Sequence, residues 1–525
     1  MEKRVAIIGA GISGLLACKY AVAAGFRPTV FEAQSKIGGL WNHTLESTRL
    51  QTPKQVFEFS DFPWPSSVKE DFPLDTQLLD YLQSYAENFG LLPYIKFNSQ
   101  VIGIDYEGES DLEMQSSELW AGTGKAFGSK GKWKIEVQVQ HDEHSSIQEY
   151  TAEFVILCIG RFSGLPSIPE FPQDHGPEVF YGKMLHSMDF SAMDNAEAVE
   201  LIKGKKVAIV GAQKSALDVA ALCANVNGSD NPCTIIVRTP HWMLPSYYVW
   251  GVPLALLYLS RFSELLIHKP GEGLLFGALA SLLSPLRWGI AKFCESYLRW
   301  KLPLKKYDMM PPHSFLQDVS ACTIVVLQDN FYSKVEEGCI RFKRSKSIGF
   351  CKEGLTLGGE GATQTVKADI VILATGYKGD EKLRNIFTSP TFQKCITGSS
   401  NSAIPLYRQM IHPRIPQLAA IGYSESLNNL YTTEMRCRWL VHFLDETIQL
   451  PSIKEMEKDV LMWENYMKSY AGNYYRRSCV GALHICYNDQ LLKDIGCNPK
   501  RKKGFIAELF QPYGPADYLE LTSNS

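Results

Sequence analysis

Two glycine-containing segments carry the residue types that bind the phosphates of a dinucleotide. The first follows the apolar run at residues 5–8 and reads Gly9-Ala10-Gly11-Ile12-Ser13-Gly14. In such a segment the first glycine allows a tight turn, the second lets the main chain approach a pyrophosphate, and the third lets the helix lie close to the strand. The anion then lies at a helix N-terminus, where unpaired N–H groups and the helix dipole favour negative charge.

Glu32 ends the strand-like run that follows this helix. A carboxylate about 20 residues after the glycines is where hydrogen bonds from an adenosine ribose are expected. Strand, glycine turn, helix, strand and acid in this order predict a dinucleotide-binding unit more specifically than the glycines alone.

The second segment reads Gly211-Ala212-Gln213-Lys214-Ser215-Ala216. Its first glycine is present and alanine is permitted at its third position, but Gln213 replaces the middle glycine. We expect this side chain to crowd the pyrophosphate and Lys214 to compensate with positive charge. The next strand ends in Arg238, and a guanidinium there suits a 2′-phosphate, which favours NADPH over NADH. Two such units suggest hydride transfer from NADPH to an FAD held by the first.

The elements that position these residues predict an α/β protein with two Rossmann-like dinucleotide-binding domains, the NADPH domain being inserted into the FAD domain. Continuous apolar runs at 153–160 and 368–377 resemble strands covered on both faces, and we expect both in the first sheet. The predicted organisation is residues 1–179 for the first part of the FAD domain, 180–322 for the NADPH domain, and 323–525 for the return to the FAD domain with a C-terminal helical region.

Residues 242–300 form an apolar helical insertion in the second domain. Its apolar runs are interrupted by charged residues and prolines and fall short of the roughly 20 residues that a spanning helix needs. We expect buried helices of a substrate-side subdomain, with peripheral contact to a membrane surface as the alternative.

Composition excludes several functions for the 525 residues. With 53 basic and 56 acidic side chains the formal net charge is −3, so no positive excess is available for nucleic acid. The 13 cysteines are scattered without a CxxC pair, which favours a reduced setting and gives no metal site. We expect a cytoplasmic protein, with peripheral attachment at the endoplasmic reticulum membrane as the alternative; the oligomeric state cannot be read from the sequence.

The segment between the two units resembles a known family. Residues 180–190, FYGKMLHSMDF, resemble the FxGxxxHxxx(Y/F) signature of flavin-containing monooxygenases, and Gly38-Gly39-Leu40-Trp41 and the ATGY run at 374–377 are similar to that family's landmarks. The match covers nearly the whole chain and is closest to the plant branch, near the group that N-hydroxylates pipecolic acid.

The resemblance implies an FAD- and NADPH-dependent monooxygenase. A C4a-hydroperoxyflavin would transfer one oxygen atom from O2 to a nucleophilic nitrogen or sulfur of a small metabolite, such as an amine or pipecolate. Gly39, Leu40 and Trp41 would lie along the FAD, and Gln51 would face the flavin and nicotinamide where many relatives have asparagine. No catalytic side chain is assigned.

Three other functions share parts of this pattern. A Baeyer–Villiger type monooxygenase acting on a carbonyl has the same folds, and a catalytically silent FAD-binding scaffold would result if Gln213 blocks NADPH. A disulfide reductase would need a close cysteine pair near the flavin, whereas the first 60 residues contain only Cys18.

Overall fold

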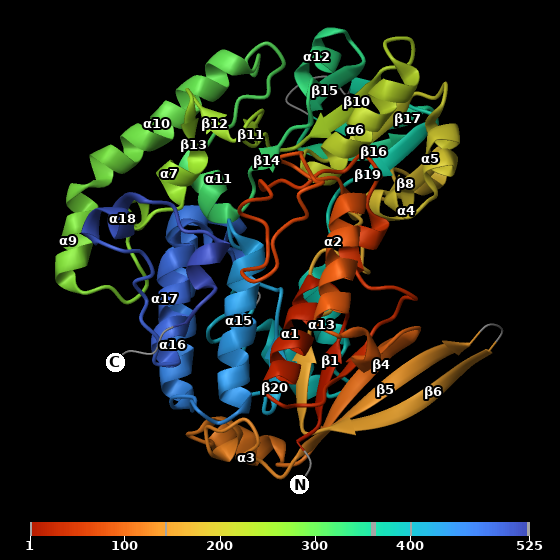
Figure 1. Cartoon of the computed structure of the whole chain (residues 1–525). Coiled ribbons are helices and arrows are strands. Elements are labelled where there is room, and N and C mark those ends of the chain that lie inside the picture. The colour runs from red at the N-terminus through yellow and green to blue at the C-terminus, as the bar shows by residue number, and fades with distance from the viewer. Residues whose placement is uncertain (1–2, 142–143, 359–363, 399–401, 522–525) are drawn as a thin grey trace.

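The computed structural model describes residues 3–141, 144–358, 364–398 and 402–521. Two five-stranded parallel sheets organise them (Figure 1). The first has the order β20-β7-β1-β2-β3, with β1 at Val5–Ile8, β2 at Thr29–Phe31, β3 at Ile95–Lys96, β7 at Phe154–Leu157 and β20 at Leu418–Ala420. The second has the order β15-β10-β9-β19-β8, with β8 at Lys183–His186, β9 at Val207–Val210, β10 at Cys233–Val237, β15 at Ile340–Arg344 and β19 at Ile370–Leu373.

Both faces of each sheet are buried, which explains the continuous apolar runs. In β1, Val5 and Ile7 face a core shared with the helices, whereas Ala6 and Ile8 face a second core beneath an antiparallel sheet. That sheet consists of β4 (Ser99–Glu107), β5 (Lys132–His141) and β6 (His144–Ala152). The second parallel sheet is covered in the same way by β16 (Ser347–Cys351), β17 (Gly354–Gly358) and β18 (Gln364–Lys367).

Strand β19 corrects one expectation about the topology. The run at 153–160 joins the first sheet as β7, next to β1, as predicted. The run at 368–377 was expected there too, but β19 pairs with β9 and β8 in the second sheet. The second sheet therefore includes strands beyond the expected boundary at residue 322. An apolar run identifies a buried strand but not which of two sheets it joins, because pairing is a long-range choice.

Helices cover the remaining faces of the two sheets. Helix α1 (Ile12–Ala23) follows β1 and lies against α15 (Asn429–Leu444), and α6 (Lys214–Asn227) follows β9. The other helices before the insertion and around the sheets are α2 (Asp75–Asn88), α3 (Asp111–Ser116), α4 (Ser187–Ser191), α5 (Asn195–Ile202), α12 (Phe331–Glu336), α13 (Gly379–Asn385) and α14 (Pro390–Thr397).

The apolar insertion is helical, but its helices are not uniformly buried. It contains the short strands β11 (Met243–Leu244), β12 (Tyr248–Val249) and β13 (Val252–Pro253), then α7 (Leu254–Tyr258), α8 (Arg261–Leu265), α9 (Leu274–Leu282) and α10 (Ser284–Lys301). In α9 only Ala280 is buried, and Leu274 is 96% exposed. The expectation of buried helices is wrong here, because an apolar sequence does not specify which neighbour covers it.

No single helix among those described is long and apolar enough to cross a membrane, whereas α9 and α10 together meet the same length and composition criteria as a pair bent by 47°.

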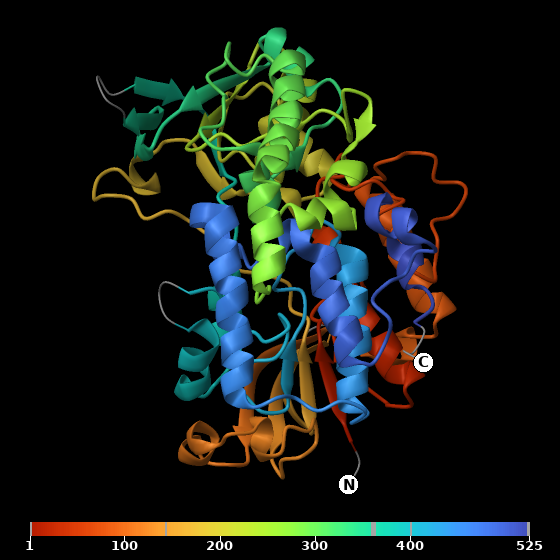
Figure 2. The ribbon, with the colours of Figure 1, turned by 90° about the vertical axis from the view of Figure 1, so that its left-hand side faces the viewer.

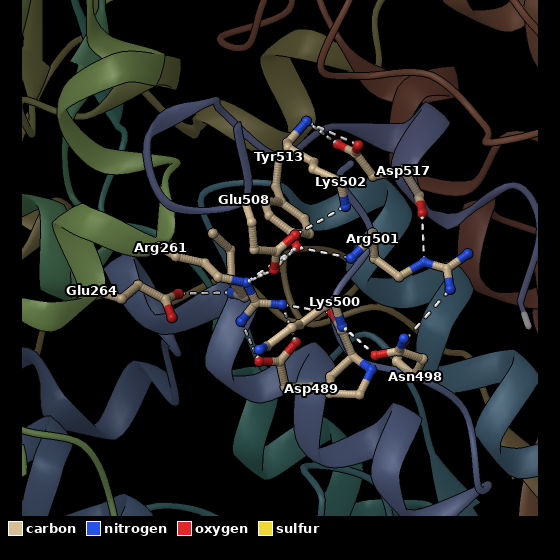
Figure 3. A network of polar contacts seen from close by, with 12 residues as sticks. Arg261, Glu264, Asp489, Asn498, Lys500, Arg501, Lys502, Glu508, Tyr513 and Asp517 are labelled. Carbon is tan, nitrogen blue, oxygen red and sulfur yellow. Dashed lines mark hydrogen bonds and ion pairs between the residues drawn. The ribbon is translucent and has the colours of Figure 1, made fainter. Parts of the chain in front are cut away.

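The insertion is tied to the C-terminal region by Arg261 of α8 (Figure 3). That region contains α16 (Ile453–Ala471), α17 (His484–Asp494) and α18 (Phe505–Phe510). The guanidinium forms ion pairs with Asp489 of α17 and Glu508 of α18 and donates to the Pro499 carbonyl at 2.6 Å. One half-buried cation therefore joins α8 to two helices of the C-terminal region.

A disulfide joins Cys322, which follows α11 (Phe315–Ala321), to Cys479 across 157 positions. The scattered spacing of the cysteines gave no sign of this pair. The residues next to it include β14 (Val325–Val326), which pairs with β11 in parallel, and Glu425, which forms a β-bridge with Cys479. The disulfide therefore joins the end of α11 to the segment between α16 and α17.

Replacing Arg261 by methionine should destabilise the protein. The substitution leaves the carboxylates of Asp489 and Glu508 without their partner, and for half-buried pairs we expect a loss of about 2 kcal/mol, between that of an exposed and that of a fully buried pair. Urea unfolding followed by circular dichroism measures the change. The control is Lys203→Met, which removes an exposed ion pair with Glu200 and should leave the unfolding curve unchanged. Equal curves for both variants would contradict the assigned role of Arg261.

Candidate cofactor and substrate site

The first glycine turn is fixed by two close approaches that exclude any other residue. Gly9 has φ of +102°, and a Cβ there would lie 2.5 Å from the Cys158 carbonyl oxygen. A Cβ on Gly14 would lie 1.9 Å from the Gly9 carbonyl oxygen. The turn and the first residues of α1 therefore lie against the carboxyl end of β7 with no space for a side chain. This close approach is the role expected of Gly9 and Gly14.

A second glycine turn lies directly against the first. The Gly38 N–H donates to the Ala10 carbonyl at 3.1 Å, and a Cβ on Gly39, which has φ of +57°, would lie 3.1 Å from the Gly11 α-carbon. Gly39 begins the 3₁₀ turn Gly39–His43, in which Leu40 is exposed and Trp41 half-buried. The residues predicted to lie along a flavin are thus brought next to the residues predicted to hold its phosphates.

The N-terminus of α1 is free to receive an anion. Its N-cap residue, Gly11, provides no side-chain hydrogen bond, so the N–H groups of the first turn, which includes Ile12 and Ser13, lack a capping acceptor. Uncapped N–H groups on a helix of 12 residues fit a diphosphate.

Glu32 lies at the carboxyl end of β2, next to the glycine turn. Its carboxylate is 5% exposed and accepts hydrogen bonds from the Ala10 N–H at 2.6 Å and the Gln34 N–H at 2.9 Å. These bonds fix the carboxylate beside the turn, and a carboxylate has lone pairs left for further donors.

The second turn repeats the geometry of the first with one difference. Gly211 has φ of +134°, and a Cβ there would lie 2.3 Å from the Ala374 carbonyl oxygen. Ala212 and Ala216 are buried, whereas Ser215 is exposed. Gln213 has φ of −95° and caps α6 without a side-chain hydrogen bond. The backbone at the middle position therefore accepts a residue other than glycine.

Lys214 is not free to compensate for Gln213. Its ammonium group bonds the Asp218 carboxylate at 2.6 Å, one turn along α6. Asp218, 3% exposed, also accepts from the Thr48 hydroxyl at 3.0 Å and from the Gln328 amide at 2.8 Å. Thr48 belongs to the first part of the chain, so this carboxylate joins the two nucleotide-type units.

Arg238 follows β10 directly and is exposed. Because β9 and β10 are adjacent and parallel, Arg238 and the turn at 211–216 lie at the same edge of the second sheet. Tyr474, whose pKa is raised by burial, lies close enough to Arg238 for the positive charge to oppose that rise.

Gln51 lies on the wall of a cavity of about 180 Å³ between the first part of the chain and the insertion. Its side-chain oxygen accepts from the Val326 N–H at 3.3 Å. Apolar and aromatic residues form most of the wall, including Tyr247, Tyr258 and Phe315. Mostly apolar walls with a few polar groups are typical of small-molecule sites.

Glu425 is the one charged side chain among the described residues that line this cavity, and Asn429 adds an amide. Arg477 donates to the Glu425 carboxylate at 3.1 Å and 3.0 Å. The side chain of Glu425 is 14% exposed, and the β-bridge to Cys479 fixes its backbone. Sequence reasoning missed Glu425 and Arg477, because no local pattern brings 425 to 477.

The sequence also missed a buried polar cluster beside the cavity. His241 and His313 each place a ring nitrogen 2.8 Å from the same oxygen of Asp318 on α11, and Tyr474 contacts the other nitrogen of His241 at 3.2 Å. Burial favours a raised pKa for Asp318, but the hydrogen bonds from the two histidines outweigh it and hold the pKa well below its ordinary value. The ring nitrogens that face Asp318 and its carboxylate already form hydrogen bonds with one another.

His186 caps a helix. Its Nδ1 accepts from the Met188 N–H at 3.1 Å and so caps α4. Its ring contacts Tyr377 edge-on, with centroids 5.7 Å apart.

Comparisons with known proteins agree with this geometry. The model of the family described as flavin-binding monooxygenase-like matches residues 2–508. "Probable flavin-containing monooxygenase 1" of Arabidopsis thaliana is 42% identical over 98% of this chain and 96% of its own length.

Solved structures share the fold. S-allyl-L-cysteine S-oxygenase from Allium sativum matches with a TM-score of 0.59 at 19% identity, over 94% of this chain and 88% of that one. OTEMO in complex with FAD and NADP matches with a TM-score of 0.64 at 16% identity, over 93% and 97%. The predicted two-domain α/β fold, the plant-type resemblance and the cofactors FAD and NADPH are confirmed at the level of the family, and the chain belongs to the flavin-binding monooxygenase-like family.

Proposed function

We propose that this protein transfers one oxygen atom from O2 to a nucleophilic nitrogen or sulfur of a small metabolite, and that its substrates include amines or amino acids such as pipecolate. FAD, when bound, accepts the hydride of NADPH and activates O2. The observation that supports this most directly is the cavity that places Gln51 and Glu425 in one apolar wall. The protein contributes binding, orientation and exclusion of water.

The residues assigned to FAD are those of the first turn. The N–H groups at Gly11, Ile12 and Ser13 would bind the diphosphate, while Gly9, Ala10 and Gly14 shape the turn. Glu32 would accept from the ribose hydroxyls, and Gly39, Leu40 and Trp41 would lie along the coenzyme. The uncapped helix N-terminus and the meeting of Gly11 with Gly39 support this assignment.

The residues assigned to NADPH are those of the second turn. The turn from Gly211 to Ala216, with Ala212, Gln213, Lys214 and Ser215, would receive the pyrophosphate, and Arg238 the 2′-phosphate. The extended backbone at Gln213 and the exposed guanidinium of Arg238 support this assignment. Gln51 would contact the flavin and nicotinamide from the cavity wall.

The Glu425 carboxylate favours a substrate that presents a hydrogen-donating nitrogen. Its ion pair with Arg477 orients the carboxylate, and its oxygens keep lone pairs for a further donor. Oxygenation of a thioether or a carbonyl does not need this acceptor, so Glu425 distinguishes the proposed N-oxygenation from the Baeyer–Villiger alternative. A catalytically silent FAD-binding scaffold would bind no substrate and would not need this carboxylate.

We also propose that residues 242–300 contact a membrane peripherally, with the endoplasmic reticulum as the membrane of an otherwise cytoplasmic protein. The exposed leucines of α9 support this contact, because an exposed apolar helix face needs an apolar partner.

Arg238→Ala should weaken NADPH binding about tenfold and leave NADH binding unchanged, because only NADPH carries the phosphate that the guanidinium would bind. Flavin bleaching as a function of coenzyme concentration measures both affinities. The matched control is Arg341→Ala on β15, which is exposed and pairs with β10. Equal losses for the two coenzymes would refute the assignment.

A panel of amines, amino acids including pipecolate, thioethers and ketones tests the reaction. We expect NADPH consumption coupled to N- or S-oxygenated products, identified by mass spectrometry. Esters formed from ketones would favour the Baeyer–Villiger alternative, and no flavin reduction at millimolar NADPH would favour the scaffold.

Glu425→Gln should raise KM for a cationic amine about tenfold, the loss of roughly one charge-assisted hydrogen bond, with little effect on a neutral thioether of similar size. Steady-state kinetics on both substrates measure the difference. Glu353→Gln, at an exposed ion pair with Lys367, is the control. If KM rose equally for both substrates, Glu425 would be supporting the wall and not recognising the nitrogen.

A further inference from the structure

A second cavity, of about 520 Å³, lies between the loop that follows α8, the first half of α10 and α16. Three of its lining residues are basic or titratable to a cation: His268, Lys269 and Arg287. The side chains from α16, such as Asn465 and Ser469, are neutral, and no carboxylate occurs among the described residues that line it. The wall is therefore suited to an anion.

Neither permanent cation of the wall forms an ion pair with a carboxylate among the described residues. Arg287 donates to the Leu266 carbonyl at 2.7 Å and to the Tyr470 hydroxyl at 3.3 Å, and its guanidinium lies over the Tyr470 ring at 5.6 Å. All these partners are neutral. Among the described residues the Lys269 ammonium forms no hydrogen bond or ion pair. These contacts orient Arg287 and leave N–H donors for a phosphate.

Two carboxylates lie near these cations without lining the cavity. Glu272 contacts the His268 ring at 2.6 Å and accepts from the Lys269 backbone N–H at 3.0 Å. Glu264 accepts from the N–H groups of Ile485 and Cys486 at the start of α17, and burial raises its pKa to about 8. Neither residue lines the cavity.

An exposed apolar face borders this cavity in sequence and in space. Leu274, Leu275 and Leu282 of α9 are 75% exposed or more, and Trp288 follows Arg287 on α10 with 65% exposed. Figure 2 shows α9 and α10 on the face turned to the viewer, with α16 beside them. Exposed leucines and a tryptophan next to basic groups are typical of a helix that lies in the membrane interface.

We propose that this cavity binds the phosphate of an anionic lipid headgroup while α9 enters the surface of the bilayer. Arg287 and Lys269 contact the phosphate oxygens, and the leucines of α9 contact the acyl chains. A site for free phosphate alone would not need the apolar face. This inference rests on the peripheral membrane contact proposed above and adds its chemistry and its residues.

Vesicle flotation of the full-length protein tests the proposal. The probes are vesicles of phosphatidylcholine alone and of phosphatidylcholine with about one third phosphatidylserine. We expect tighter binding to the anionic vesicles, and each of Arg287→Gln and Lys269→Gln to lower that affinity about fivefold, since one basic residue near the surface contributes about 1 kcal/mol. Lys301→Gln, exposed at the far end of α10, is the matched control and should change nothing.

Further measurements distinguish the ways in which the proposal could be wrong. Leu275→Ser should weaken binding to both kinds of vesicle, and NADPH consumption in all variants should equal that of the wild type. Equal affinity of the wild type for both vesicles, or unchanged affinity in both charge variants, would overturn the headgroup site while leaving the membrane contact. If the protein bound neither kind of vesicle, both the headgroup site and the membrane contact would be overturned. If inorganic phosphate bound the cavity and no vesicle bound the protein, the cavity would be a site for a free anion.

Discussion

The contact between the Gly9 carbonyl oxygen and the α-carbon of Gly14 is the constraint on which the nucleotide side of this molecule depends. A Cβ at Gly14 would lie 1.9 Å from that oxygen, so any side chain would push α1 away from the strand that precedes it. With α1 held in place, its uncapped N–H groups, the turn at Gly39 and the carboxylate of Glu32 all face one region. This close packing is possible because glycine has no Cβ, and the preference for an anion follows from the helix dipole.

The relation between the two nucleotide-type units depends on buried polar groups. Asp218 can be buried because Lys214, Thr48 and Gln328 together satisfy it, and two of these partners come from outside α6. A buried carboxylate without partners would be costly, so this set of bonds favours one arrangement of the units over others. The disulfide between Cys322 and Cys479 likewise constrains the structure at the smaller cavity, which Cys322 lines.

The two cavities differ in the charged groups that line them. The smaller one carries Glu425 in a mostly apolar wall, and the charge of this carboxylate is paired with Arg477. The larger one is lined by Lys269 and Arg287 and by no carboxylate among the described residues. A carboxylate with lone pairs left for a donor suits an N–H group, and a basic wall beside exposed leucines suits an anionic interface.

The sequence by itself determined the two glycine turns, the strand, helix and strand around each of them, and the places of Glu32 and Arg238 after the second strands, because each of these is set by local steric and hydrogen-bonding rules over about 30 residues. Only the tertiary structure decided that β19 belongs to the second sheet, that α9 is exposed, that Asp218 meets Thr48, and that Glu425 meets Arg477. An apolar run or a lone charge specifies what a segment needs to contact. Which distant segment meets that need is settled by long-range packing, which no local pattern encodes.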